Sequence, residues 1–151
     1  MTELEEHYVS IGNHLVRVED DSVFMLCRGM LIESELIELY SIFAEVRKAH
    51  AMVFVLYDGR LLTGMDPKAR KMSAMTNKPE LKLDLQVSFG ASFAVRVIAG
   101  LILKAAALLG RDSPPVYLFE KEADARVFFR SERARIRAQL GRVSIPSPPP
   151  S

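Results

Sequence analysis

The segment that decides the fold is AMVFVLYDGRLLTGMDPKARK, residues 51–71. Its apolar run, residues 52–56, is typical of a strand buried on both faces in a parallel sheet. We expect a short loop after it and then a basic helix that Asp66 and Pro67 begin, because Asp is a good N-cap and Pro suits the first helical position. Ligands of open α/β sheets bind where such strands end and helices begin. This junction is therefore the first candidate for a functional site.

The remaining sequence predicts strands and helices in alternation. Two short alternating runs, residues 8–11 and 15–18, flank Gly12-Asn13 and predict an antiparallel hairpin. The segments that follow it predict strands at 23–27, 52–56, 83–89 and 115–119 and helices at 33–48, 67–75, 93–109 and 122–140. This order predicts an α/β fold: a single domain with a mostly parallel central sheet, an N-terminal β-hairpin and about four helices.

Length and composition are those of one ordinary globular domain, with 151 residues, 49% of them hydrophobic and 26% charged. We assign residues 1–142 to this domain and residues 143–151, VSIPSPPPS, to a disordered or extended tail. The single cysteine, Cys27, cannot form an internal disulfide, and the N-terminus MTELEEHYVS lacks the features of a signal peptide. Both observations favour a cytoplasmic protein.

The predicted helix at 93–109 is very apolar. Its 17 residues include Arg96 and Lys104, whereas a membrane span needs about 20 apolar residues. Arg96, Gly100, Lys104 and Ala107 share one narrow sector, so the wide apolar remainder needs cover on more than one side. A central core helix is the favoured interpretation. A helix shared across a homodimer interface is second, and interfacial membrane binding is third.

No catalytic or cofactor-binding set stands out. Asp58 and Asp66 flank the expected loop, but no neighbouring His, Glu or Asp completes an acid/base or metal site. Turn formation explains Asp58 and helix capping explains Asp66. The histidines have no ligand spacing, and no phosphate-binding glycine motif is present. We therefore expect no enzymatic activity, no metal and no cofactor.

Four arginines of the last predicted helix share one face, because they are spaced four, three and four residues apart. They are Arg126, Arg130, Arg133 and Arg137. An anionic partner, such as an acidic protein, an anionic lipid or a nucleic acid, would relieve their mutual repulsion. Glu122, Asp124 or Glu132 could relieve it internally. A plain solvated face is favoured, and nucleic acid is disfavoured because the nearby Phe128 and Phe129 have the pattern of core residues.

Three segments resemble STAS domains, the fold of bacterial anti-sigma-factor antagonists, and in particular the divergent bacterial STAS/SEC14-like branch. They are VFVLYDGRLLTGMDPKARK (53–71), QVSFGASFAVRVIAGLILKAAALLG (86–110) and PVYLFEKEADARVFF (115–129). The first is a buried strand with an acidic turn, a loop and a basic helix. The second is a strand, a Gly turn and a long apolar helix. The third is a strand that leads into an acidic helix start.

The resemblance implies a non-enzymatic domain that works by binding. Regulatory members of the family carry Asp-Ser-Ser-Gly or a similar motif at the start of the helix after the central strand, and phosphorylation of the serine breaks their complex. The corresponding segment here is Leu62-Thr63-Gly64-Met65. It lacks the serine, and Thr63 lies off register.

Our first hypothesis is a bacterial, cytoplasmic protein-interaction module that forms a homodimer and binds a protein partner. The candidate partner-binding residues are Asp58, Thr63, Gly64, Asp66, Lys68, Arg70 and Lys71. The second hypothesis is a SEC14-like carrier, in which the methionines and the apolar helix line a pocket for a small hydrophobic or lipid ligand. An enzyme that uses Asp58 or Asp66 ranks last.

Overall fold

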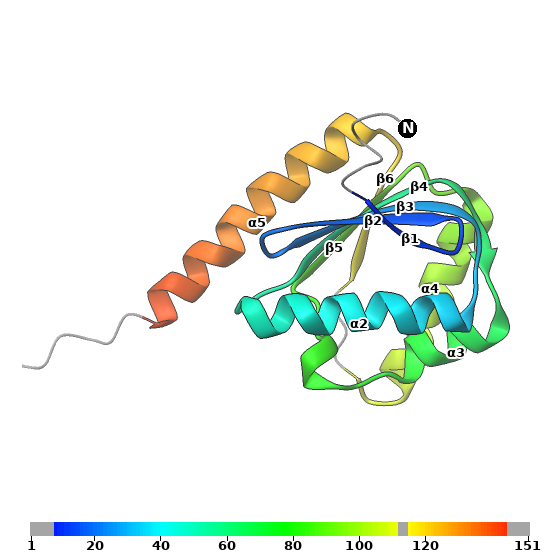
Figure 1. Cartoon of the computed structure of the whole chain (residues 1–151), viewed down its shortest axis with the longest axis horizontal. Coiled ribbons are helices and arrows are strands. Elements are labelled where there is room, and N and C mark those ends of the chain that lie inside the picture. The colour runs from blue at the N-terminus through cyan, green and yellow to red at the C-terminus, as the bar shows by residue number, and fades with distance from the viewer. Residues whose placement is uncertain (1–7, 112–114, 145–151) are drawn as a thin grey trace, which may run out of the picture.

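The computed structural model describes residues 8–111 and 115–144, and this part of the chain forms one sheet of six strands in the order β1-β2-β3-β4-β5-β6 (Figure 1). The strands are β1 (Val9–Ile11), β2 (His14–Glu19), β3 (Ser22–Leu31), β4 (Phe54–Met65), β5 (Leu85–Phe89) and β6 (Val116–Phe119). The helices are α2 (Glu33–Ala49), α3 (Pro67–Met75), α4 (Phe93–Leu108) and α5 (Glu122–Ser144), with a short 3-10 helix, η1 (Pro79–Leu81), before β5.

Pairing within the sheet confirms the predicted fold class. β1, β2 and β3 are antiparallel neighbours, whereas β3, β4, β5 and β6 are parallel. The predicted hairpin turn is present, because Ile11 pairs with His14 across Gly12 and Asn13. Gly12 has a φ of 57°, and a Cβ atom there would collide with the carboxylate of Glu35. Glycine adopts this left-handed conformation without strain, and a larger residue would also have to displace the Glu35 side chain.

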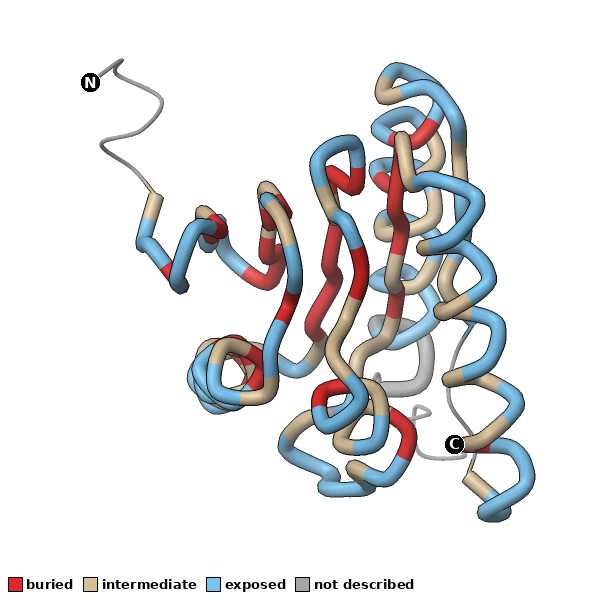
Figure 2. The backbone as a smooth tube through the Cα atoms, turned by 90° about the vertical axis from the view of Figure 1, so that its right-hand side faces the viewer, coloured by how far each residue is buried: buried red, intermediate tan, exposed pale blue. Residues whose placement is uncertain are grey.

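Helices cover both faces of the sheet, and each face has its own core. One core joins α2 and α3 to the first four strands, through buried residues that include Val23, Met25, Leu39, Phe43 and Val55. The other joins α5 to β4 and β5, through Phe54, Leu56, Val87, Phe89, Ala125 and Phe129. Figure 2 shows the buried residues concentrated along the strands. The central strands therefore contribute to both cores.

Two predicted helix starts are confirmed. The side chain of Asp66 accepts a hydrogen bond from the backbone N–H of Ala69 at 2.7 Å, and Pro67 is the first residue of α3. Ser92 caps α4 in the same way, accepting from the N–H of Val95 at 3.3 Å. Both caps satisfy N–H groups that have no partner inside the helix.

The predicted loop between Asp58 and Asp66 is wrong. β4 continues to Met65, so Thr63 and Gly64 lie in a strand. β3 is ten residues long and pairs with β4 as far as Met65, with register shifts along the ladder. Asp58-Gly59 therefore does not form a turn that reverses the chain. It lies at a local irregularity in the pairing of β4 with its long partner strand β3.

The prediction that residues 93–109 form a central core helix is also wrong. Within α4 only Ala106 is buried, and the side chains of Phe93 and Leu108 are 74% and 89% exposed. One side of α4 faces the sheet, and the opposite side faces solvent. No helix in the described part of the chain is long and apolar enough to cross a membrane.

The last helix is longer than predicted. α5 extends to Ser144, two residues into the segment assigned to the tail. The remainder of that predicted tail, residues 145–151, lies outside the described residues.

A buried histidine for which the sequence predicts no role connects three elements. His14 on β2 is fully buried. Its Nδ1 accepts from the backbone N–H of Arg28 on β3 at 2.9 Å, so Nε2 carries the proton and donates to Glu35 Oε1 on α2 at 3.2 Å. The same Glu35 oxygen accepts from the N–H of Ile32 and so caps α2. The ring therefore holds the hairpin, β3 and the start of α2 together.

We expect His14→Ala to lower the free energy of unfolding by about 1–3 kcal/mol, because it removes a fully buried ring and leaves the N–H of Arg28 without its side-chain acceptor. Chemical denaturation followed by circular dichroism measures the change. The matched control is His50→Ala, at the half-buried end of α2, for which we expect a loss within about 0.5 kcal/mol. Equal losses for the two variants would contradict the role given to His14.

Candidate functional site

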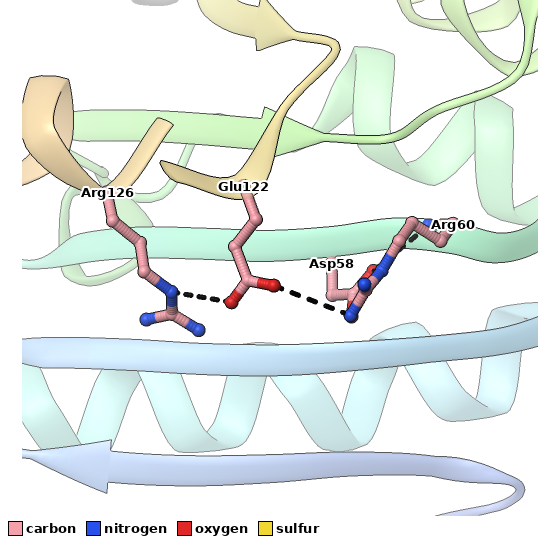
Figure 3. Close-up of polar contacts among 4 residues, drawn as sticks. All are labelled: Asp58, Arg60, Glu122 and Arg126. Carbon is pink, nitrogen blue, oxygen red and sulfur yellow. Dashed lines mark hydrogen bonds and ion pairs between the residues drawn. The ribbon is translucent and has the colours of Figure 1, made fainter. Parts of the chain in front are cut away.

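Four charged side chains meet where β5 and β6 end, namely Asp58 and Arg60 on β4 and Glu122 and Arg126 on α5 (Figure 3). Arg60 Nη2 lies 2.7 Å from Asp58 Oδ2 and 3.6 Å from Glu122 Oε1. Arg126 Nε donates to Glu122 Oε2 at 2.7 Å. The guanidinium carbons of Arg60 and Arg126 also lie 5.4 and 6.0 Å from the ring centroid of Phe89. The four groups form a continuous chain of ion pairs that links β4 to α5.

The Asp58 carboxylate is fully engaged in this network. Burial alone would raise the pKa of Asp58, but the hydrogen bonds and charge of Arg60, together with the charge of Arg126, outweigh burial and hold this pKa below its ordinary value. Oδ1 accepts from the backbone N–H of Arg60 at 3.1 Å and from its Nε at 3.0 Å. A general acid or base needs a pKa near the working pH. Asp58 therefore does not fit that role.

The second candidate carboxylate, Asp66, lies elsewhere and is occupied as the N-cap of α3. The structure thus separates Asp58, which contacts α5, from Asp66. Among the described residues, no group of three or more His, Cys, Asp and Glu side chains is placed to hold a metal ion. The arrangement of these carboxylates supports a structural role for both.

The other candidate partner-binding residues differ in their exposure to solvent. Thr63 on β4 and Lys68 and Lys71 on α3 are exposed. Gly64 is buried and Arg70 is half-buried. The accessible part of the predicted surface is therefore the end of β4 with the outer side of α3, and it is basic.

Three of the four α5 arginines contact the protein itself. Arg126 pairs with Glu122, one of the three acidic residues that the sequence offered as internal partners. Arg133 Nη1 donates to Ser22 Oγ at 2.8 Å, and Arg137 Nε donates to Asp21 Oδ2 at 2.8 Å. Asp21 is buried, so its pair with Arg137 is less screened than an ordinary surface ion pair. The internal contacts relieve much of the repulsion, and Arg130 remains exposed.

A cavity of about 480 Å³ lies on the opposite face of the sheet, between the strands and helices α2, α3 and α4. Its volume is within the range of about 300–1,000 Å³ that is usual for small-molecule sites. The walls are mostly apolar and come from every surrounding element; they include Met25 and Leu31 of β3, Leu39 and Phe43 of α2, Met65 of β4, and Ile98, Ile102 and Leu103 of α4. Methionines and the apolar helix, which the carrier hypothesis placed around a pocket, both line this cavity.

The side chains of Cys27 and Tyr57 in the wall of the cavity are neutral at ordinary pH. Burial raises the pKa of the Cys27 thiol to about 12, with a smaller contribution from the charge of Asp58. Burial also raises the pKa of Tyr57, whose hydroxyl donates to Gln86 Oε1 at 3.1 Å. Cys27 is thus a packing residue and not a nucleophile, because the thiolate is the reactive form.

Comparison with solved structures identifies the fold. The chain is similar to the anti-sigma factor antagonist SpoIIAA in its unphosphorylated form, with a TM-score of 0.50, 12% sequence identity, and coverage of 81% of this chain and 97% of that chain. It is also similar to an uncharacterised protein of the DUF3478 family from Shewanella loihica PV-4 with a SpoIIAA-like fold, with a TM-score of 0.50, 14% identity, and coverage of 80% and 97%. No family model matches the sequence, and no curated protein matches it. The chain therefore has a STAS-like fold of the SpoIIAA type, as the resemblance predicted.

Asp58→Asn removes a carboxylate whose pKa is lower in the folded chain than in the unfolded chain. Such a group adds stability above its unfolded pKa, about 3.9 for Asp, and this stability is lost as the pH falls through the folded value. We expect Asp58→Asn to be less stable than wild type at neutral pH, with the difference closing below about pH 4.

Urea unfolding across this pH range measures the difference. The control is Asp124→Asn, which replaces an exposed carboxylate in the first turn of α5. A stability difference for Asp58→Asn that stays constant down to about pH 3 would contradict the lowered pKa.

Proposed function

We propose that the protein is a STAS-type regulatory module that works by binding a protein partner, without turnover, in the cytoplasm of a bacterium. The observation that carries the proposal is the SpoIIAA-like fold, since one similar structure is an anti-sigma factor antagonist. The engagement of Asp58 with Arg60 and of Asp66 as a helix cap supports it, because neither carboxylate is free for acid/base chemistry.

The partner surface that we propose is the end of β4 with the outer side of α3. Its exposed side chains are Thr63, Lys68 and Lys71, and Asp66 fixes the start of the helix that presents the two lysines. An acidic partner surface would complement this charge. Thr63 lies within a strand and not at a helix start, so regulation by the family's serine phosphorylation is not part of the proposal.

We further propose that the protein is a homodimer, formed through the outer side of α4. Phe93, Val97, Leu101 and Leu108 are exposed along this helix, by 74%, 44%, 53% and 89%. Their spacing places them on one side, and exposed apolar patches of this kind mark interaction sites. Nucleic acid is a disfavoured partner, because three of the four α5 arginines are engaged within the chain.

The charge-reversal variant Lys68→Glu/Lys71→Glu tests the partner surface. We expect affinity capture from a lysate of the source organism, read by quantitative mass spectrometry, to retrieve a specific partner with wild type and at least tenfold less of it with the variant. Lys121→Glu, which reverses an exposed charge before α5, is the matched control and keeps the partner. A partner held equally by all three proteins would contradict the proposed surface.

A second candidate function is a carrier for a small hydrophobic ligand. The cavity of about 480 Å³ favours it, because densely packed interiors contain few voids larger than a water molecule. A carrier of this kind needs no catalytic group. It uses the face of the sheet that α4 covers, so it is compatible with a partner surface on α3.

Native mass spectrometry, followed by denaturing mass analysis, tests the dimer and the carrier together. We expect a dimer for wild type and a monomer for Leu101→Asp, whereas Val127→Asp on the exposed side of α5 remains dimeric. A loaded carrier shows an additional mass that is lost on denaturation. A monomeric wild type contradicts the dimer, and a clean apo mass contradicts a tightly loaded carrier.

A further inference from the structure

The charged side chains that line the cavity are all basic. They are the exposed Lys78 and Lys82 at the edge of the cavity and the half-buried Arg111, and none of the described lining residues is Asp or Glu. Among the described residues, the carboxylates nearest to Lys78 and Lys82 along the chain are Glu80 and Asp84. Glu80 is exposed on η1, and Asp84 accepts from Arg47 Nη2 at 2.9 Å. An ionised group inside the cavity would therefore meet positive charge.

The three basic residues belong to one end of the cavity. Lys78 and Lys82 flank η1, against which the second half of α2 packs, since Arg47 donates to the carbonyl of Lys82. Arg111 follows α4, and its Nη1 donates to the carbonyl of Ala74 in the last turn of α3. The far end of the cavity is different in character. It is lined by apolar residues at the ends of β3 and β4, the start of α2 and the first half of α4: Leu31, Met65, Leu36, Val95 and Ile98.

Arg111 also carries a hydrogen-bond donor without an acceptor. Its Nε is buried and has no partner among the described atoms, and it is the only such nitrogen that belongs to a residue lining the cavity. A buried unpaired donor is rare and calls for an acceptor. Neutral hydroxyl groups lie near Arg111. Tyr40 interacts with Ser73, Thr76 and Arg111, and burial raises the pKa of the Tyr40 hydroxyl.

We propose that the cavity binds a single-chain amphiphile with an anionic headgroup, the headgroup at the Arg111 end and the hydrocarbon chain between the sheet and α4. This inference rests on the carrier function proposed above and names its ligand class. An anionic oxygen would supply the acceptor that Arg111 Nε lacks, and the apolar end would bury the chain. Carboxylates and phosphate monoesters both carry an anionic oxygen of this kind. The ligands of the test distinguish between these two headgroups.

Isothermal titration calorimetry of the delipidated full-length protein tests the proposal with four ligands that share one chain, each below its micellar concentration or, for dodecanol, below its solubility limit. The ligands are dodecanoate, dodecyl phosphate, dodecanol and dodecyltrimethylammonium. We expect at least one anionic ligand to bind at least tenfold more tightly than dodecanol and than dodecyltrimethylammonium. The stronger of the two anions identifies the headgroup.

Two pairs of variants locate the ligand. Arg111→Gln should weaken binding of the preferred anion at least tenfold and leave dodecanol unchanged, whereas Arg96→Gln, on the outer side of α4, should change neither. Ala99→Phe fills the cavity and should abolish binding, whereas Ala94→Phe on the exposed side of α4 should not. If Arg111→Gln does not fold, Lys78→Gln/Lys82→Gln replaces it, with an expected loss of at least threefold.

The outcomes separate the inference from the function on which it rests. Equal binding of all four ligands, with no effect of Arg111→Gln, overturns the anionic ligand and leaves a carrier of apolar molecules. Undiminished binding by Ala99→Phe overturns the cavity as the site. Binding of no ligand by the folded wild-type protein overturns the carrier function itself.

Discussion

The first half of the central strand β4, residues 54–59, is largely buried on both faces, and this burial sets the position of the helices. Phe54 and Val55 are fully buried, although they are neighbours and therefore point to opposite faces of the sheet. Phe54 is covered by α5 and Val55 by α2 and α3. β3 and β5 pair with β4 on either side, so its backbone groups are satisfied as well. Three layers follow because the first half of this strand exposes neither face to water.

The two layers of helices pack against the sheet unequally. On the α5 side, aromatic rings fill the space: Phe24 contacts Phe129 with ring centroids 5.8 Å apart. On the other side β5 contributes Gln86, and the side of α4 that faces the sheet includes small residues such as Ala99 and Ala106. Small and polar side chains cannot fill the gap that larger apolar ones would close. The cavity is thus a consequence of which residues face each side of β5 and α4.

Local signals predicted much of the fold, and the failures concern contacts between distant residues. The hairpin turn at Gly12-Asn13 and the helix cap Asp66 could be predicted, because turns and helix starts depend on neighbouring residues. The length of β4 could not be predicted in this way, because its second half is held by pairing with β3. The exposure of α4 was missed for a similar reason, since an apolar helix has the same sequence whether it packs in a core or borders a cavity.

Less of the candidate site could be predicted. Asp58 was identified as a turn residue, but its bond to Arg60 and the link through Glu122 depend on the approach of α5 to β4. The pair of Arg137 with Asp21 joins residues 116 positions apart, and no spacing rule reaches that far. The basic end of the cavity likewise assembles from α4 and the connection after α3. The charged groups of this site are brought together only by tertiary contacts, so the sequence alone does not predict the site.

The central claim is that the sheet is tightly packed under α5 and leaves an open apolar cavity under α4. A crystal structure of the protein under xenon pressure tests it directly, because xenon enters apolar cavities and is excluded from close-packed cores. The account predicts xenon between the sheet and α4, beside Ile98 and Ile102, and none between the sheet and α5. A structure in which α4 lies against the sheet with no xenon beneath it would contradict the account.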